Sequence, residues 1–289
     1  MIKELIISMR PKQWYKNLVI FIGIVFSLNL LNLNLWVNSI GAFAIFCALS
    51  GSIYIINDIL DIEKDKNHPK KRLRPIASGK LKINYAILSV IILVALSLYF
   101  SYLINLLFLL GSLSFFILLF IYSLFLKQLI IVDIMVISTG FVLRAIAGCL
   151  AVGVLISPWL IICAFLLALF LSIGKRRHEL VLLGDNAKNH RKILDGYSTQ
   201  MLDQMINITT SALIMSYSLY TFFTGKIFIM LTIPFAFYGL FRYIYLVHAE
   251  NFGGEPEMLF KDKGMVISMI FWVLLVIIVL YGINITRFL

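Results

Sequence analysis

Residues 36–65 read WVNSIGAFAIFCALSGSIYIINDILDIEKD, an apolar run of about 20 residues that ends in a cluster of four acids. A run of this length crosses a hydrocarbon core of roughly 30 Å as one α-helix. Comparable runs recur at about 18–35, 36–56, 85–103, 106–126, 130–155, 158–174, 205–224, 227–247 and 265–285. The remainder is too short for a separate soluble domain. We therefore predict an all-α polytopic membrane protein, one domain over residues 1–289 with nine transmembrane helices.

Composition and charge agree with a membrane protein. Hydrophobic residues make up 61% of the 289 positions, charged residues make up 13%, and the net charge is +11. Twenty-one of the 25 lysines and arginines fall on one side of the predicted spans, two fall on the other and two lie within spans. By the positive-inside rule, this asymmetry predicts a cytoplasmic (inner) membrane protein with its N-terminus in the cytoplasm and its C-terminus outside. The excess of bases is then an orientation signal combined with anion binding, and we expect no nucleic-acid partner.

The acidic cluster carries the strongest indication of chemistry. On a continuous helix, Asn57, Asp58, Asp61 and Asp65 fall within an arc of roughly 100°, while Glu63 points the other way. An oxygen-rich face suits Mg²⁺, which takes one or two carboxylates, substrate phosphate oxygens and waters. The alternative is a solvated loop whose charges pair with one another. Three aspartates on one helical face favour the metal site.

Two clusters of bases lie on the same predicted side of the membrane as the acids. Lys71, Arg72 and Arg74 follow the acidic stretch directly and can hold anionic groups that a metal leaves uncovered. The sequence GKRRHE at 174–179 ends the sixth predicted span. That sequence is also typical of a stop signal, and its lysine and glutamate can pair at i,i+4. If it faces the aspartates across a cavity, the two patches together suit a diphosphate.

Arg144 lies about 14 residues into the fifth predicted span, near the middle of the bilayer. An unpaired guanidinium there costs at least ~2.5 kcal/mol. Asp133 is on the same predicted helix but ~16 Å away along its axis, too far for a direct ion pair. Arg144 must therefore contact a carboxylate on another helix, backbone carbonyls or a polar cavity.

Several motifs resemble known ones. Asn57-Asp-x-x-Asp61-x-x-x-Asp65 resembles the first aspartate-rich motif of the UbiA superfamily of intramembrane prenyltransferases. Five further blocks are similar to its decaprenyl-phosphate phosphoribosyltransferase branch. These are Arg10-Pro-Lys-Gln-Trp-x-Lys-Asn17, His68-Pro-x-Lys-Arg-x-Arg74-Pro-Ile-x-x-Gly79, Gly140-Phe-x-Leu-Arg-Ala-Ile-Ala-Gly148, Gly174-Lys-Arg-x-x-Glu179 and Gly254-Glu-Pro-Glu257. The blocks follow one another over residues 10–257, so the resemblance covers nearly the whole chain.

The resemblance implies a nine-helix bundle around a cavity open to the cytoplasmic face, with Mg²⁺ as the cofactor. It implies transfer of 5-phosphoribose from phosphoribosyl diphosphate to a polyprenyl phosphate such as decaprenyl or undecaprenyl phosphate, with release of diphosphate. The residues and the resemblance together assign catalysis to Asp58, Asp61 and Asp65, metal binding to Asn57, Asp61 and Asp65, and substrate binding to Lys16, Lys71, Arg72, Arg74, Arg144, Lys175, Arg176 and Glu179. The oligomeric state stays open.

One departure from the wider superfamily bears on the donor. Its usual second motif, Asp-x-x-x-Asp after the sixth helix, is absent, and Lys175-Arg176-x-x-Glu179 stands in its place. A donor held partly by bases fits this better than a prenyl diphosphate held between two aspartate–metal patches. Prenyl transfer to an aromatic acceptor or to haem remains the alternative enzyme. A transporter is a weaker alternative, because the charged groups crowd one face and no polar path crosses the predicted spans.

Overall fold

The computed structural model describes residues 2–155, 157–183, 192–249 and 261–282, and all regular elements in these ranges are helices. The block Gly254–Glu257 and the last residues of the ninth predicted span lie outside the described ranges. The chain divides into two compact units, residues 1–127 with 140–156, and residues 128–139 with 157–289. The single domain expected from the sequence stays a prediction.

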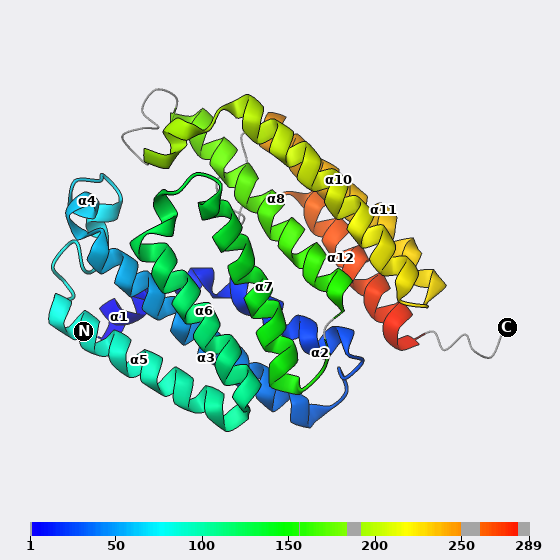
Figure 1. Ribbon diagram of the computed structural model, residues 1–289, viewed down its shortest axis with the longest axis horizontal. Coiled ribbons are helices and arrows are strands. Elements are labelled where there is room, and N and C mark those ends of the chain that lie inside the picture. The colour runs from blue at the N-terminus through cyan, green and yellow to red at the C-terminus, as the bar shows by residue number, and fades with distance from the viewer. Residues whose placement is uncertain (1, 156, 184–191, 250–260, 283–289) are drawn as a thin grey trace. The chain divides into compact units, whose positions relative to one another are not determined.

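The first unit is built around the long helix α3. Its elements are α1 (Ile2–Ser8), η1 (Pro11–Phe21), α2 (Ile22–Phe26), α3 (Leu33–Leu60), α4 (Ile62–Lys66), η2 (Lys71–Leu73), α5 (Ile83–Ile104), α6 (Leu106–Leu124), the start of η3 (Leu126–Gln128) and the second part of α7 (Val132–Val152). Helices α5 and α6 lie beside α3 (Figure 1). Together α3 and α6 bury Phe46, Phe108 and Phe115, with ring centroids 6.0 and 4.8 Å from Phe46. A separate cluster, in which Ile55 packs with Ile76, Leu81 and Ala86, holds the end of α3 that carries the acids.

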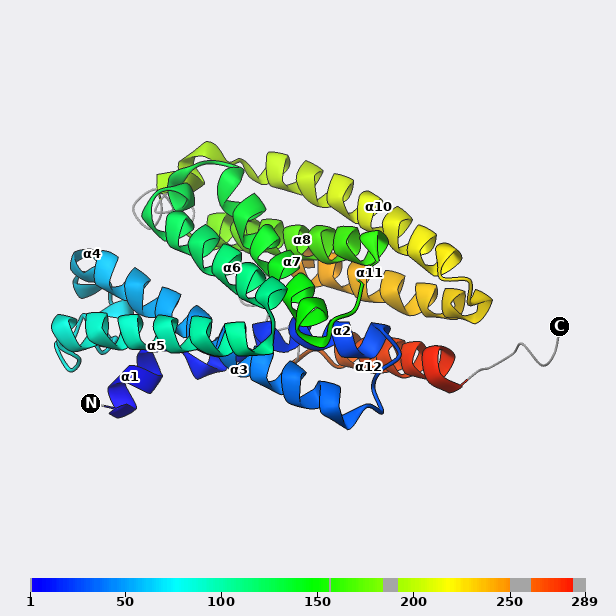
Figure 2. The same ribbon diagram turned by 60° about the horizontal axis from the view of Figure 1, so that its bottom comes forward.

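The second unit is built around α8 and α10, which lie along each other (Figure 2). Its elements are the first part of α7, α8 (Pro158–Leu183), η5 (Lys192–Gly196), α10 (Thr199–Phe223), η6 (Ile227–Thr232), α11 (Ile233–Ala249), α12 (Lys263–Ile277) and the π-helix η8 (Ile278–Gly282). Its core includes Ile134, Phe170 and Tyr243, the two rings 4.7 Å apart. The core therefore joins α7, α8 and α11.

Seven helices among the described residues are long and apolar enough to cross a membrane: Leu33–Leu60, Ile83–Ile104, Leu106–Leu124, Val132–Val152, Pro158–Leu182, Ile227–Ala249 and Lys263–Gly282. The seventh predicted span corresponds to α10, which does not meet the same hydropathy criterion. The prediction of one helix over 18–35 is wrong, because α2 ends at Phe26 and Leu28 has a φ of 62°. Asn29 donates to the Ser27 carbonyl (3.0 Å), and such local hydrogen bonds compete with helix. The count of nine spans stays a prediction.

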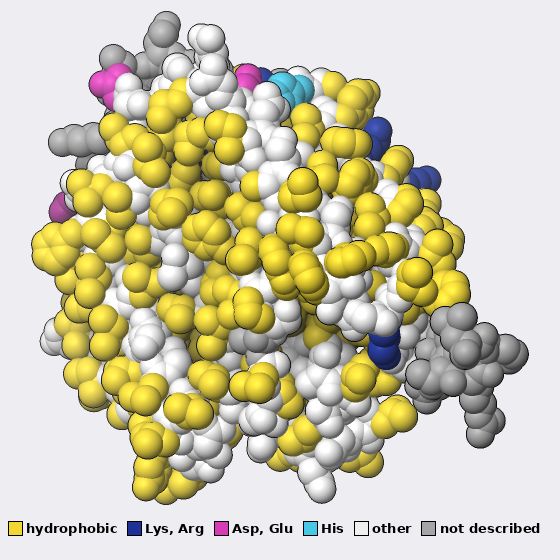
Figure 3. Space-filling model, turned by 45° about the vertical axis from the view of Figure 1, so that its right-hand side comes forward, with side chains coloured by type: hydrophobic (Ala, Val, Ile, Leu, Met, Phe, Trp, Pro, Cys, Tyr) yellow, Lys and Arg dark blue, Asp and Glu magenta, His cyan; other side chains and the backbone are white. Residues whose placement is uncertain are grey.

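Apolar side chains also cover the outside of the helices. The face shown in Figure 3 is largely hydrophobic, with its charged side chains at the margins. In the second unit, α10, α11 and α12 expose Ile208, Phe222, Phe241 and Phe271. An apolar surface of this extent is unfavourable in water and favourable against lipid.

In the first unit, η1 with α2 and α7 approach each other backbone to backbone at two glycines. A Cβ added to Gly148 would collide with the carbonyl oxygen of Ile20, and one added to Gly23 would lie 2.8 Å from the Gly148 carbonyl oxygen. Small residues permit such approaches between membrane helices. Because Gly148 is one turn beyond Arg144, this approach also brings η1 within reach of that arginine.

We expect Gly148→Ala to destabilise the protein by about 1–3 kcal/mol, because the added methyl group meets a backbone carbonyl that cannot rotate away. The measurement is the thermal unfolding midpoint in detergent. Gly41→Ala is the matched control, since its Cβ would meet only Ile104 Cδ1 at 3.8 Å. Alanine in that helix should be neutral or stabilising. Equal unfolding midpoints for the two variants would contradict the close approach at Gly148.

Candidate active site

The acidic stretch begins in the last turn of α3 and continues into α4. Helix α3 ends at Leu60, and Asp61, with φ −100° and ψ 13°, separates it from α4. The expectation of one continuous helix through Asp65 is therefore wrong. Backbone hydrogen bonds from Asp61 N to Asn57 O (3.0 Å) and from Asp65 N to Asp61 O (2.8 Å) keep the two helices joined. The break turns Asp61 away from the partners that Asp58 and Asp65 share.

Asp58 and Asp65 form a buried ion network with two arginines. Asp58 and Asp65 are each about 2% exposed to solvent. Arg74 Nη1 lies 3.1 Å from Asp58 Oδ1 and 2.5 Å from Asp65 Oδ2, and Arg10 Nη2 lies 2.5 Å from Asp58 Oδ1. The Arg10 guanidinium also stacks 4.9 Å from the centroid of the Tyr54 ring. Removing one member of such a network leaves a buried charge uncompensated.

Asp61 has a different partner. Lys127 Nζ, just beyond α6, lies 2.9 Å from Asp61 Oδ2, and Lys64 Nζ lies 3.8 Å from Oδ1. Glu63 points away as predicted, is largely exposed and pairs with Lys66 at 2.8 Å. The structure thus places Asp58 with Asp65 and gives Asp61 a separate basic partner.

Three further predicted bases of the first unit are Lys16, Lys71 and Arg72. Arg72 is exposed, whereas Lys71 is half-buried. Burial lowers the pKa of the Lys71 ammonium, and the charge of Arg74 lowers it further. An approaching anion would favour the charged form of Lys71. Lys16 donates a hydrogen bond to Gln13 Oε1 on the same 3₁₀ helix and lies 6.0 Å from the Tyr15 ring.

In the second unit, the 174–179 cluster lies in the C-terminal part of α8 and forms an ion network of its own. Arg176 Nε lies 2.8 Å from Asp133 Oδ2, and its Nη1 lies 2.6 Å from Glu179 Oε2. Tyr197 donates from its hydroxyl to Asp133 Oδ1 (3.1 Å) and accepts from Ile131 N (2.7 Å). Glu179, which the sequence allows to pair with Lys175, contacts Arg176 at i,i+3. Arg176 is 2% exposed and anchors α8 to the start of α7.

Arg144 is held by neutral groups. Its Nε donates to Asn17 Oδ1 (2.8 Å) and its Nη1 donates to Gly140 O (3.1 Å). The guanidinium lies 4.6 Å from the Phe115 ring centroid and 5.1 Å from that of Phe141. Among the residues that the structure describes, no carboxylate forms a salt bridge with Arg144. The sequence allowed a carboxylate on another helix, backbone carbonyls or a polar cavity as the surroundings of Arg144. The structure shows a backbone carbonyl, together with the side-chain oxygen of Asn17 and two aromatic rings.

The predicted metal ligands do not form a three-residue set. Within the described ranges, no three His, Cys, Asp or Glu side chains could hold a metal ion together. Asp61 is paired with Lys127, and the Asn57 amide donates to Ile53 O (3.0 Å), which leaves its oxygen as the available donor. Asp58 and Asp65 nevertheless converge on one cationic nitrogen, that of Arg74. This pair fits Mg²⁺, which binds through one or two carboxylates when phosphate and water complete its shell.

Two residues near the acids were not assigned by the sequence argument. Arg10 begins the first motif block, but its distance from Asp58 along the chain hid their pairing. Lys127 is the sole charged residue between positions 83 and 132. A lone base in a long apolar stretch is a signal that could have indicated a partner for Asp61.

Comparison with known proteins shows the family of this chain. Residues 18–261 match the UbiA prenyltransferase family. The chain belongs to the UbiA prenyltransferase family. It is therefore a multi-pass, all-helical membrane protein of a transferase family, as the sequence predicts.

Two relatives and one solved structure are similar to this chain over nearly its whole length. Decaprenyl-phosphate phosphoribosyltransferase from Corynebacterium glutamicum is 30% identical over 287 residues, covering 95% of this chain and 86% of the relative. The protein of the same name from Mycolicibacterium smegmatis is 29% identical, covering 94% and 91%. The fold matches a UbiA homologue from Archaeoglobus fulgidus bound to GPP and Mg²⁺, with a TM-score of 0.73, 18% identity and coverage of 97% and 100%.

Proposed function

We propose that this protein transfers 5-phosphoribose from phosphoribosyl diphosphate to a polyprenyl phosphate and releases diphosphate. The relatives that share nearly the whole chain carry the name of this activity. The observation that carries the proposal is the buried network in which two carboxylates and two arginines meet. Such a network offers both signs of charge, as a donor with a metal-bound diphosphate and a separate sugar phosphate requires.

The transfer joins an oxygen of the lipid phosphate to C1 of the ribose. The bond from C1 to the diphosphate oxygen breaks, and diphosphate leaves with the bonding electron pair. Since the lipid phosphate is already anionic at neutral pH, the step needs no strong base. Arg10 and Arg74 can pass from the carboxylates to phosphate oxygens, for which a guanidinium has the right geometry. Lys71 and Arg72 lie on the same loop and would add charge for the donor.

Mg²⁺ would be held by Asp58 and Asp65; the assignment of Asn57 and Asp61 as metal ligands stays a prediction. When bound, the ion neutralises charge on the departing diphosphate. The support for this ion is the convergence of the two carboxylates, together with the Mg²⁺ in the Archaeoglobus fulgidus homologue. The roles of Lys16, Lys175 and Glu179 in substrate binding stay predictions.

The donor can be tested by ligand-induced stabilisation. A ligand that binds only the folded state raises the unfolding midpoint according to its concentration and affinity. In detergent with Mg²⁺, phosphoribosyl diphosphate should raise the midpoint more than geranyl diphosphate does at the same concentration. A shift with geranyl diphosphate and none with phosphoribosyl diphosphate would favour prenyl transfer instead.

We further propose that the acidic end of α3 faces the cytoplasm in the inner membrane. The asymmetry of lysines and arginines supports this orientation. A reporter that is active only in the cytoplasm should therefore be active at the N-terminus and silent at the C-terminus. Activity at both ends would mean that the number of spans is even.

A further inference from the structure

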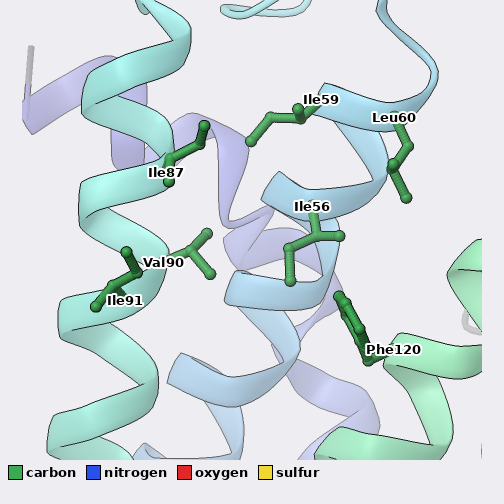
Figure 4. Close-up of a pocket in the computed structure, with 7 residues that line it drawn as sticks. All are labelled: Ile56, Ile59, Leu60, Ile87, Val90, Ile91 and Phe120. Carbon is green, nitrogen blue, oxygen red and sulfur yellow. The ribbon is translucent and has the colours of Figure 1, made fainter.

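An apolar groove lies beside the acidic end of α3 in the first unit (Figure 4). Its volume is about 250 Å³, and its lining comes from α3, α5 and α6: Ile56, Ile59, Leu60, Ile87, Val90, Ile91 and Phe120. On α3 and on α5 the lining residues have the spacing i, i+3, i+4, so each helix presents one apolar stripe to the other. Leu60, Ile87, Ile91 and Phe120 are exposed, so the groove opens on the outside of helices that span the membrane.

An ion pair lies just beyond the groove's lining along the chain of α3. The lining residue Leu60 is covalently followed by Asp61, whose carboxylate contacts the ammonium of Lys127 at 2.9 Å. Lys127 also follows the helix that contributes Phe120. The apolar lining on α3 is therefore followed directly, along the chain, by the residue that the half-buried Lys127 ammonium contacts.

This arrangement complements a lipid with a phosphate directly attached to a hydrocarbon chain. Whole-ligand pockets usually measure about 300–1,000 Å³, so this smaller groove suits only part of a long ligand. It extends for about one helical turn along α3, or ~6 Å, and the rest of a long chain would remain in the bilayer. The ammonium of Lys127 supplies the positive charge for the phosphate end.

We propose that Lys127 binds the phosphate of the polyprenyl phosphate acceptor while the groove between α3, α5 and α6 holds the isoprenoid units next to that phosphate. The inference rests on the proposed function, because it assigns a place to that reaction's acceptor. It gives the acceptor an entrance from the lipid side, and it brings its phosphate to Asp61, at the same end of α3 as the Asp58–Asp65–Arg74 network. Lys127 is then a substrate-binding residue that exchanges Asp61 for phosphate.

The test fills the groove without touching the charged network. Ile87→Trp places a large side chain in the groove, whereas Leu88→Trp, the matched control, adds the same side chain at the next position, which is exposed and outside the lining. We expect Ile87→Trp to raise KM for polyprenyl phosphate at least 10-fold and leave KM for phosphoribosyl diphosphate within 2-fold of the parent. Leu88→Trp should leave both constants near those of the parent. An unchanged acceptor KM in a folded Ile87→Trp variant would overturn the groove assignment.

Lys127 is tested by charge. Lys127→Gln should raise the acceptor KM, and Lys127→Arg should keep it near that of the parent. A merely structural role would change thermal stability and both KM values together.

Crosslinking gives a readout that is independent of turnover. A polyprenyl phosphate with a diazirine in its first isoprene unit should crosslink to α5 or α6 beside the groove. Excess unlabelled polyprenyl phosphate should compete, and excess phospholipid should not. Equal competition by phospholipid would make the groove an ordinary lipid contact. If the parent protein transfers no phosphoribose, the proposed function fails. If the parent is active and the Ile87 and Lys127 variants behave like the parent, the groove inference fails and the proposed function stands.

Discussion

Asp65→Asn is expected to lower kcat/KM for phosphoribosyl transfer by about 10²–10³-fold, a loss of roughly 3–4 kcal/mol of transition-state stabilisation. The Asp65 carboxylate is buried beside Arg74 at 2.5 Å and converges with Asp58 on the same cationic nitrogen. The amide keeps the shape and one acceptor oxygen but removes the charge that would hold a divalent cation. The measurement is initial rate against donor concentration, with folding checked by the unfolding midpoint.

Glu63→Gln is the control for that substitution. Glu63 lies two residues away on the same short helix, but its side chain is 78% exposed and pairs with Lys66. Neutralising it should change neither rate nor stability by more than about 0.5 kcal/mol. Comparable losses in the two variants would mean that any change of charge in α4 impairs the enzyme, and the assignment of Asp65 would fail.

A double-mutant cycle separates two roles of Asp65. If Asp65 serves only to neutralise Arg74, the double variant Asp65→Asn/Arg74→Gln should be no less active than Arg74→Gln alone, since neither charge is then unpaired. If Asp65 binds the cation that accompanies the diphosphate, the double variant should be less active than Arg74→Gln alone. We expect this further loss of turnover, together with a partial recovery of thermal stability relative to Asp65→Asn.

Arg144→Ala is expected to destabilise the protein by roughly 3 kcal/mol or more. The substitution leaves the Asn17 side-chain oxygen without its charged donor and opens a cavity between Phe115 and Phe141. Asn17 also accepts from Ser50 (3.4 Å) and donates to Cys47 Sγ (3.3 Å), so the loss extends into α3. The measurement is the unfolding midpoint in detergent, and it should fall with or without donor present.

Arg242→Ala is the matched arginine substitution. Arg242 forms a bidentate pair with Asp262, at 2.7 and 3.1 Å, in a partly exposed position of the second unit. An exposed pair of this kind contributes about 0–1 kcal/mol. A midpoint for Arg144→Ala no lower than that for Arg242→Ala would contradict a structural role for Arg144, and a selective loss of donor binding would then make it a substrate-binding residue.

Much of the fold follows from hydropathy alone, because an apolar run of about 20 residues has few alternatives to a membrane helix. Hydropathy does not locate breaks inside such runs. The first predicted span is interrupted by asparagine side chains that bond to the nearby backbone, and its 3₁₀ segment packs against Gly148. That close approach depends on a residue more than 120 positions away, which no local pattern reveals.

In the candidate site, too, local features could be predicted from the sequence and contacts between distant segments could not. The acids of 57–65 were found because their spacing is local, yet their partners come from Arg10, Arg74 and Lys127. Periodicity on an ideal helix also grouped Asp61 with Asp65, whereas the break at Asp61 gives it another partner. Arg74 was expected to hold anionic groups of a ligand, and the structure places its side chain, 28% exposed, against two buried carboxylates of the chain itself. Ion pairing between distant segments decides these contacts, and sequence spacing carries no record of it.

The most direct test of the proposed activity follows both halves of the donor in one reaction. Purified protein in detergent would be given Mg²⁺, polyprenyl phosphate and phosphoribosyl diphosphate labelled with ¹⁴C in the ribose and ³²P in the β-phosphate. We predict that ¹⁴C passes into the organic phase with the lipid while ³²P stays in the aqueous phase as diphosphate, in equal molar amounts, and that a chelator or Asp65→Asn stops both. Release of ³²P without ¹⁴C in the lipid, or transfer of a prenyl group from a prenyl diphosphate under the same conditions, would contradict the proposed activity.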